Sequence, residues 1–146
     1  MQPPTSPQTA IRVDLPEALR RALQTFARVS LGLIFVVAGL DGFLDVLPHP
    51  SKPLPERAIL FAGALLKSGY LFPMLKGTEL LAGAAFLSNY LVPLGVAMIA
   101  PVVVNMFAFH LFLARDGLAL AFILLALEVF LAWTYRHVFC PLFAAR

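Results

Sequence analysis

The chain has 146 residues, 60% of them hydrophobic, and its mean hydropathy is +0.86. Soluble domains are about half apolar, so this excess indicates an integral membrane protein of one domain. The net charge of +3 comes from Lys and Arg scattered at the ends of apolar runs, which excludes the basic stripe that nucleic acid needs. The single cysteine, Cys140, excludes an intramolecular disulfide and a self-contained thiol–disulfide reaction, which needs a second thiol.

The chain begins with a segment that we expect to precede the membrane domain. Residues 1–25 start as a Pro-rich tail, predicted to be disordered, and lack the apolar core of a secretory signal. The stretch DLPEALRRALQ, residues 14–24, then predicts a short helix that Asp14 caps and whose three leucines share one face. This helix is expected to lie at the membrane surface and to lead into a four-span domain at residues 26–146.

Four apolar runs are long enough to cross a bilayer, which takes about 20 helical residues for about 30 Å of hydrocarbon. The turns SNYLVP and ARDG are short, so the last three runs are expected to be antiparallel neighbours. The sequence thus predicts an all-α fold, an integral membrane four-helix bundle. The predicted spans are Phe26–Leu47, Leu71–Val92, Pro93–Leu113 and Gly117–Tyr135.

The connection between the first two spans differs from the other turns. A proline-rich break, LPHPSKPLP, is followed by an apolar run from Glu56 to Leu66 that is too short to cross. We predict a short interfacial or re-entrant helix here, with residues 67–69 as its C-terminal stop. It could cover one mouth of the bundle, but an interfacial helix that only packs against its neighbours is the favoured interpretation.

The distribution of Lys and Arg predicts the orientation. With four spans, both termini and the turn between the second and third spans share one side, which carries six arginines. The other side carries four Lys and Arg residues, or five if Lys76 is counted. This difference favours termini in the cytoplasm, and we expect a multi-pass protein of a bacterial inner membrane.

Polar and ionisable side chains inside the predicted spans are the candidates for function. Near mid-bilayer each Asp, Lys or Arg disfavours insertion by about 2.5–3.5 kcal/mol, so such residues usually face the bundle interior. Each span has at least one, and the simplest arrangement points all of them toward a shared polar interior. No catalytic residue is assigned, and no metal site is expected because the sequence lacks the Glu-x-x-His motifs of carboxylate-bridged metal pairs. The candidates for ligand binding are Arg28, Asp41, Glu79, Asn105, His110 and Glu128.

Helical spacing, at about 100° per residue, indicates which side chains can act together. Gly32 and Gly39 share a face on which a neighbouring helix could approach closely. Lys76 and Glu79 are three positions apart and can form an ion pair. We therefore expect a close helix contact at the two glycines and a charge pair in the second span.

Asn105 and His110 lie in one span but are about 140° apart around its helix. A single small ligand is therefore not expected to meet both side chains. For Asn105, a hydrogen bond to a neighbouring helix is favoured over a ligand contact, because polar side chains often bond across membrane helices. For His110 two interpretations stay open: a position at the membrane interface, or a site with Glu79 or Glu128 that binds a quinone head group or relays a proton.

Four stretches of the sequence carry a family resemblance: RVSLGLIFVVAGLDGFL, SGYLFPMLKGTELLAGAAFL, LVPLGVAMIAPVVVNMFAFHLFL and a fourth span that ends in WTYR. Together they resemble the DoxX-like family of small four-span membrane proteins, over nearly the whole chain except its tail. Some DoxX-like proteins are associated with membrane oxidoreductases, including thiosulfate:quinone oxidoreductases. The resemblance therefore implies a link to quinone-dependent redox chemistry. The positions that match the family's polar pattern are Arg28, Glu79, Asn105 and His110, whereas Asp41 and Glu128 rest on their own chemistry.

These observations lead to two functional hypotheses. The first is a subunit or accessory of a quinone-linked membrane oxidoreductase system, with the bilayer and a membrane redox subunit as partners and a quinone as candidate cofactor. The alternative is a lipid- or partner-binding assembly protein without catalysis, whose polar groups hold the helices in register. A proton-coupled carrier is disfavoured because the spans show no inverted repeat. The oligomeric state stays open, with a homo-oligomer as one option.

Overall fold

The computed structural model describes residues 16–48 and 53–143, and within these ranges the chain is helical and has no β-strand. Four long helices form a ring in which α1 contacts α3, α3 contacts α4, α4 contacts α5 and α5 returns to α1. The predicted all-α bundle, with a short helix between its first two long helices, is confirmed. The elements in chain order are α1 (Glu17–Leu44), α2 (Glu56–Lys67), α3 (Leu71–Ser88), α4 (Val92–Phe112), the short 3₁₀ helix η1 (Arg115–Gly117), α5 (Leu118–Thr134) and α6 (Arg136–Phe143).

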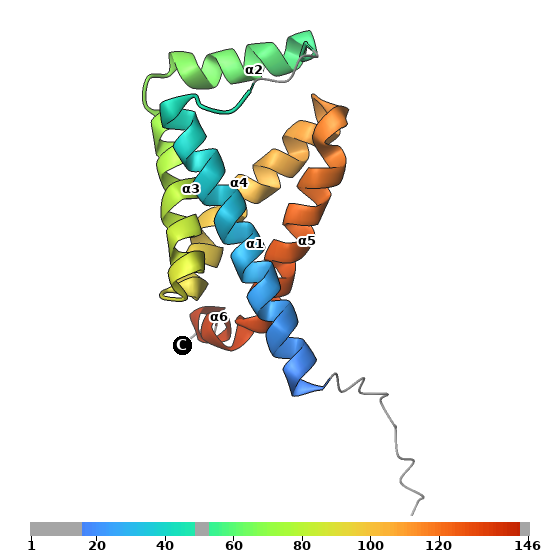
Figure 1. Cartoon of the computed structure of the whole chain (residues 1–146). Coiled ribbons are helices and arrows are strands. Elements are labelled where there is room, and N and C mark those ends of the chain that lie inside the picture. Colours follow the sequence, from blue (N-terminus) through green and yellow to red (C-terminus); the bar gives the residue numbers. More distant parts are fainter. Residues whose placement is uncertain (1–15, 49–52, 144–146) are drawn as a thin grey trace, which may run out of the picture.

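Two short helices lie across the ends of the ring (Figure 1). Helix α2 crosses the end at which α1 finishes and α3 begins, and α6 crosses the opposite end. The fourth predicted span ends as expected, since α5 stops at Thr134. Helix α6 was not predicted, because eight residues are too short a run for a helical pattern to stand out.

Among the described residues, three helices are long and apolar enough to cross a membrane, or four if the bent pair of α2 and α3 counts as one span. The three are α1, α4 and the unit of η1 with α5. Helix α3 alone has 18 residues, which is about 27 Å at 1.5 Å per residue and slightly less than the hydrocarbon thickness. It meets α2 at an angle of 91°. This arrangement fits a multi-pass membrane protein with one broken or re-entrant span.

Helix α1 runs without interruption for 28 residues. The sequence predicts a separate surface helix before the first span, but in the described part of the chain the two form one helix. The reason is local: residues 17–31 contain neither Gly nor Pro and are rich in Ala, Leu and Arg, which favour a continuous helix. The rest of the expected N-terminal segment, including Asp14, lies outside the described residues.

The turn between α3 and α4 comes earlier than predicted. Helix α3 ends at Ser88, although the apolar pattern continues to Val92. Asn89 and Leu91 have positive φ angles of 57° and 58°, which stop the helix and reverse the chain. Pro93 then lies in the first turn of α4, where a backbone N–H would have no partner inside the helix, so the N–H that proline lacks is not needed.

The bend between α2 and α3 is built by Ser68 and Gly69. Gly69 has a φ of +77°, a conformation that side chains with a Cβ rarely adopt. The Ser68 hydroxyl donates to the Leu65 carbonyl at 2.7 Å and accepts from the Leu71 amide at 3.0 Å, so it links the end of α2 to the start of α3. The predicted C-terminal stop is confirmed, since α2 ends at Lys67.

The closest backbone approach between long helices joins α1 and α3. A Cβ atom built on Gly39 would lie 2.9 Å from the backbone nitrogen of Leu80, and one on Gly83 would lie 2.8 Å from that of Val36. Gly32 is covered by α3 side chains in the same way. The predicted close contact at Gly32 and Gly39 is confirmed. Small residues stabilise such pairs because they let the two backbones gain van der Waals contact.

The apolar core fills the inside of the ring. All four long helices contribute to it, and α2 and α6 contribute none of its largest fully buried side chains. The core is therefore a property of the ring and not of the two end helices. Its largest buried apolar side chains are Phe35, Phe86, Leu31, Ile99, Leu124, Leu131 and Val103.

The α1–α3 contact predicts opposite effects for two glycines in the same helix. Gly83→Ala should lower the free energy of unfolding by about 1–3 kcal/mol, because the new methyl group meets the backbone of α1. Gly77→Ala is the matched control: no atom lies within 4 Å of its Cβ position, so this change should be neutral or stabilising by up to about 1 kcal/mol. Thermal unfolding of both variants in one detergent checks this, and equal melting temperatures would contradict the close contact.

Candidate functional site

An apolar groove lies between α2, α3 and α4, at the end of the bundle that α2 crosses. Two cavities of about 300 and 260 Å³ lie side by side in it, since both are lined by Leu65, Leu75, Val102 and Asn105. A third cavity of about 220 Å³ continues from Asn105 along α4. We call these three cavities together the Asn105 groove.

Apolar side chains make most of the wall of the Asn105 groove. Helix α2 closes one side with Phe61 and Leu65. The ring of Phe61 lies 5.7 Å from the ring of Phe109 on α4, and this contact holds α2 over the groove. Methionine side chains are flexible and adapt to ligands of irregular shape. The methionines of the wall are Met74, Met98 and Met106.

Asn105 is the polar group at the centre of the groove, because it lines all three cavities. Its side chain is exposed, and no described residue forms a hydrogen bond with its carboxamide. The prediction that Asn105 forms a hydrogen bond to a neighbouring helix is therefore wrong. Helix α4 turns Asn105 outward, away from the ring, whereas its neighbour Val103 is buried. A carboxamide among apolar walls is unfavourable without a partner, so this position suits a ligand that brings one.

Lys76 and Glu79 form the charged part of the wall. The Lys76 Nζ lies 2.9 Å from the Glu79 Oε2, so the predicted pair is confirmed. The Glu79 side chain is only 2% exposed and the Lys76 side chain 18%. The methylene stem of Lys76 covers Gly42 of α1, and its ammonium group lies 5.8 Å from the centre of the Phe72 ring. The pair is thus held from two sides and faces the 260 Å³ cavity.

Arg28 acts at the end of the bundle opposite to α2. Its Nη1 donates a hydrogen bond to the backbone carbonyl of Phe86, in the last turn of α3. The last carbonyls of a helix have no partner inside the helix and carry partial negative charge, so a cation there is stabilising. Arg28 therefore ties α1 to the end of α3 and does not reach the Asn105 groove.

Asp41 also binds backbone groups. Its Oδ1 accepts from the amide of Val46 at 3.0 Å and from that of Leu47 at 2.7 Å. The carboxylate thereby closes the turn that follows α1, in which Asp45 takes a left-handed conformation. The expectation that Asp41 points into a shared polar interior is wrong, because the chain reverses here and its free amides need an acceptor.

His110 shapes the turn between α4 and α5. Its Nδ1 lies 2.8 Å from the carbonyl oxygen of Ala114, and a carbonyl can only accept, so Nδ1 carries the proton. The ring also lies where a Cβ on Gly117 would be, at 2.1 Å from Cε1, so residue 117 must lack a side chain. The hypothesis that His110 meets Glu79 or Glu128 gains no support, because neither acid is a bonding partner of its ring.

Glu128 lies inside the ring on α5. It is 4% exposed, and in the described part of the chain both of its carboxylate oxygens lack a hydrogen-bond partner. The buried residues on either side of it along the same face are Leu124 and Leu131. Tyr135, seven residues further along, accepts a hydrogen bond from Gln24 of α1. Glu128 does not line the Asn105 groove.

The structure thus brings two of the six candidates together. Glu79 and Asn105 line one cavity, and Lys76 and Phe61 complete it although the sequence did not single them out as ligand contacts. The three-residue spacing between Lys76 and Glu79 was a signal that could have identified Lys76. The position of Phe61 in the cavity could not be predicted in this way, because it depends on the bend that places α2 over α3. Within residues 16–48 and 53–143, no three His, Cys, Asp or Glu side chains are close enough to hold a metal ion. The candidates outside the groove are Arg28, Asp41, His110 and Glu128.

No protein-family model matches this chain, and no curated protein or solved structure matches it either. The chemistry of the groove indicates what kind of molecule it can hold. An amide and an ammonium group can donate hydrogen bonds there, a carboxylate can accept them, and the surrounding wall is apolar. Such a site suits a lipid-soluble molecule that has a polar head and an apolar body.

The ion pair predicts an asymmetric effect of its two single substitutions. Lys76→Gln should lower the free energy of unfolding by about 3 kcal/mol, because it leaves the buried carboxylate of Glu79 without its partner. Glu79→Gln should have a smaller effect, since the more exposed ammonium of Lys76 can turn toward solvent or head groups. The double variant should resemble Glu79→Gln in thermal unfolding. Equal effects of the two single changes would contradict this account.

Proposed function

We propose that the Asn105 groove binds a lipid-soluble ligand of quinone type, and that the protein is a DoxX-like subunit or accessory of a quinone-linked membrane oxidoreductase system. The observation that carries this proposal is the exposed carboxamide of Asn105, which has no partner in the described part of the chain and lies in an apolar groove beside the Lys76–Glu79 pair. In this role the protein holds the quinone, and a partner subunit supplies and removes the electrons.

The chemistry of a quinone fits the groups in the groove. A quinone has two carbonyl oxygens, which accept hydrogen bonds, on a flat ring with an apolar tail. The Asn105 amide and the Lys76 ammonium are donors, while Phe61, Phe109 and the methionines can contact the ring and tail. Cavities of about 300 and 260 Å³ lie at and just below the lower end of the range typical of small-molecule sites, which suits a head group with its tail left in the lipid.

The proposal extends to the orientation of the protein in a bacterial inner membrane. Over the full sequence, the side that has both termini carries six arginines, whereas the opposite side carries four Lys and Arg residues, or five with Lys76. Cytoplasmic segments of membrane proteins have an excess of Lys and Arg, so this difference supports termini in the cytoplasm and a groove nearer the outer side.

A second candidate is an assembly protein that binds an acyl chain or a partner's helix in the same groove without any redox role. The apolar character of most of the wall favours it. The two candidates differ in what they require of Asn105, since an acyl chain has no carbonyl oxygen to accept a hydrogen bond at that position. Binding to the Asn105→Leu variant therefore separates them.

Ligand binding should depend on Asn105 and not on His110. Ubiquinone-1 should bind the purified protein in detergent, and Asn105→Leu should weaken this binding about tenfold through loss of one hydrogen bond. His110→Gln is the matched control, because His110 is a polar residue of the same helix whose ring bonds outside the groove. Equilibrium dialysis gives both dissociation constants.

The outcome decides between the candidates. If Asn105→Leu binds both ubiquinone-1 and a simple alkyl chain as tightly as the original protein does, the assembly role replaces the quinone role. If His110→Gln weakens binding and Asn105→Leu does not, the groove is the wrong site. If Glu79→Gln and Asn105→Leu also leave the activity of a co-purified redox partner unchanged, the link to an oxidoreductase system fails.

A further inference from the structure

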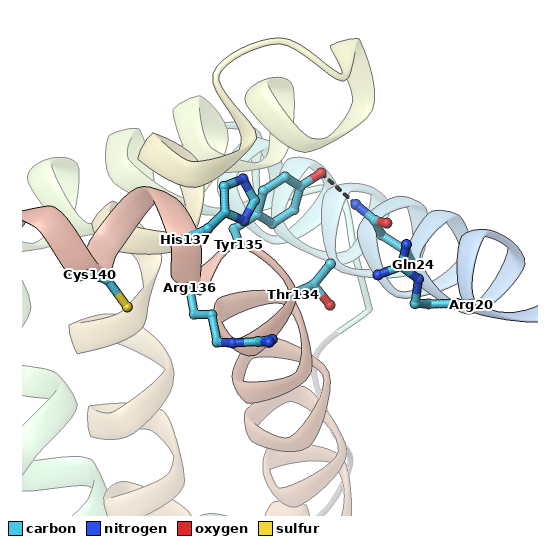
Figure 2. A pocket seen from close by; sticks show the side chains of 7 residues that line it. All are labelled: Arg20, Gln24, Thr134, Tyr135, Arg136, His137 and Cys140. Carbon is cyan, nitrogen blue, oxygen red and sulfur yellow. Dashed lines mark hydrogen bonds between the residues drawn. The ribbon is translucent and has the colours of Figure 1, made fainter. Parts of the chain in front are cut away.

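Another cavity, of about 490 Å³, lies at the end of the bundle far from the Asn105 groove. It is formed where α1, the end of α5 and α6 meet, and Figure 2 shows the side chains that surround it. The fold creates it because α6 turns away from α5 directly after Tyr135 and lies across the end of the ring. Its lining residues are Arg20, Gln24, Thr134, Tyr135, Arg136, His137 and Cys140.

The lining of this cavity is cationic. It has two arginines, Arg20 and Arg136, and the imidazole of His137, and no carboxylate is among the lining residues. Arg20 comes from α1 and Arg136 from the start of α6, so the two charges reach the cavity from separate helices. Because both arginines line one cavity that has no acid among its lining residues, an anion bound there would be attracted by each of them.

Neutral polar groups complete the lining. The Gln24 amide donates to the Tyr135 hydroxyl at 2.8 Å and ties α1 to the end of α5 (Figure 2). This bond leaves the Tyr135 hydroxyl proton and the second amide proton of Gln24 as further donors. The lining therefore offers both charged and neutral donors, the combination that the oxygen atoms of a phosphate group require.

The cavity lies at a level that suits the membrane interface. Trp133, just before it in the chain, is 68% exposed, and tryptophan is enriched where hydrocarbon meets head groups. The guanidinium of Arg136 lies 5.0 Å from the centre of the Trp133 ring and donates to the Trp133 carbonyl at 3.2 Å. These contacts fix Arg136 in place, which lowers the entropy lost when it binds an anion.

We propose that this cavity binds a phosphate-bearing anion, held by Arg20 and Arg136 from opposite sides with His137, Gln24 and Tyr135 as further contacts. Arginine suits this role because its planar fork of donors matches phosphate geometry. The same phosphate chemistry is offered by an anionic phospholipid and by a soluble phosphate compound. The position beside Trp133 favours the lipid. This site is separate from the Asn105 groove and does not depend on the quinone proposal.

The test compares Arg20 and Arg136, which line the cavity, with Arg21, which follows Arg20 in α1 and does not line it. The full-length protein, purified in a neutral detergent, is titrated with dioleoylphosphatidylglycerol, and bound lipid is counted by native mass spectrometry. Arg20→Gln and Arg136→Gln should each weaken binding about tenfold. Arg21→Gln is the matched control: Arg21 lies at the same end of α1 but pairs with Glu17 at 2.8 Å and does not line the cavity. This control should bind the lipid as the original protein does.

Two further titrations identify the source of the phosphate. Inorganic phosphate and glycerol 3-phosphate are added as competitors. Displacement of the lipid at millimolar concentration, with the same dependence on Arg20, would assign the site to soluble phosphates, and its absence would assign it to the lipid. The proposal is overturned if Arg20→Gln and Arg136→Gln bind the lipid as tightly as Arg21→Gln. Melting temperatures without lipid verify folding, and Arg20 is exposed on its helix, so that variant is expected to fold.

Discussion

The contact between α1 and α3 is the constraint on which the rest of the structure depends. Because Gly39 and Gly83 bring the two backbones together, Lys76 lies directly over α1 and directs its ammonium group to Glu79. The same contact brings Arg28 within reach of the last carbonyls of α3. A wider spacing between these helices would move Lys76 away from α1 and Arg28 away from the end of α3. The charged part of the groove wall is therefore a result of backbone packing.

Hydropathy and spacing predicted much of the fold, because long apolar runs, short turns and paired glycines act locally. They predicted only part of the candidate site, since Glu79 and Asn105 line the groove and the other four candidates do not. Asp41 and His110 have the appearance of buried functional groups in the sequence, yet each binds backbone atoms at a helix end. The direction in which Asn105 points depends on the rotation of α4 against its neighbours, and no pattern within α4 determines that rotation. The apolar wall also needs α2, whose position follows from one bend at Gly69.

The two ends of the bundle differ in chemistry. At the α2 end, the wall of an apolar groove contains one amide and one ion pair, whereas at the α6 end two arginines line a polar cavity that has no carboxylate among its lining residues. Both sites are formed where a short helix crosses the ring and meets a long one. The apolar core fills the inside of the ring, so the two candidate sites lie at its ends, beside the short helices.

Helix α2 has a consequence for the rate at which a ligand could exchange. Ala58 is its one buried residue, and its contacts with the bundle are few compared with those among the long helices. Elements with little buried apolar surface open with small free energies, while a packed ring opens rarely. The groove therefore has a stable floor on α3 and α4 and one weakly held wall. The Phe61–Phe109 ring contact is part of that wall, so the residence time of a ligand would depend on α2 and not on unfolding of the bundle.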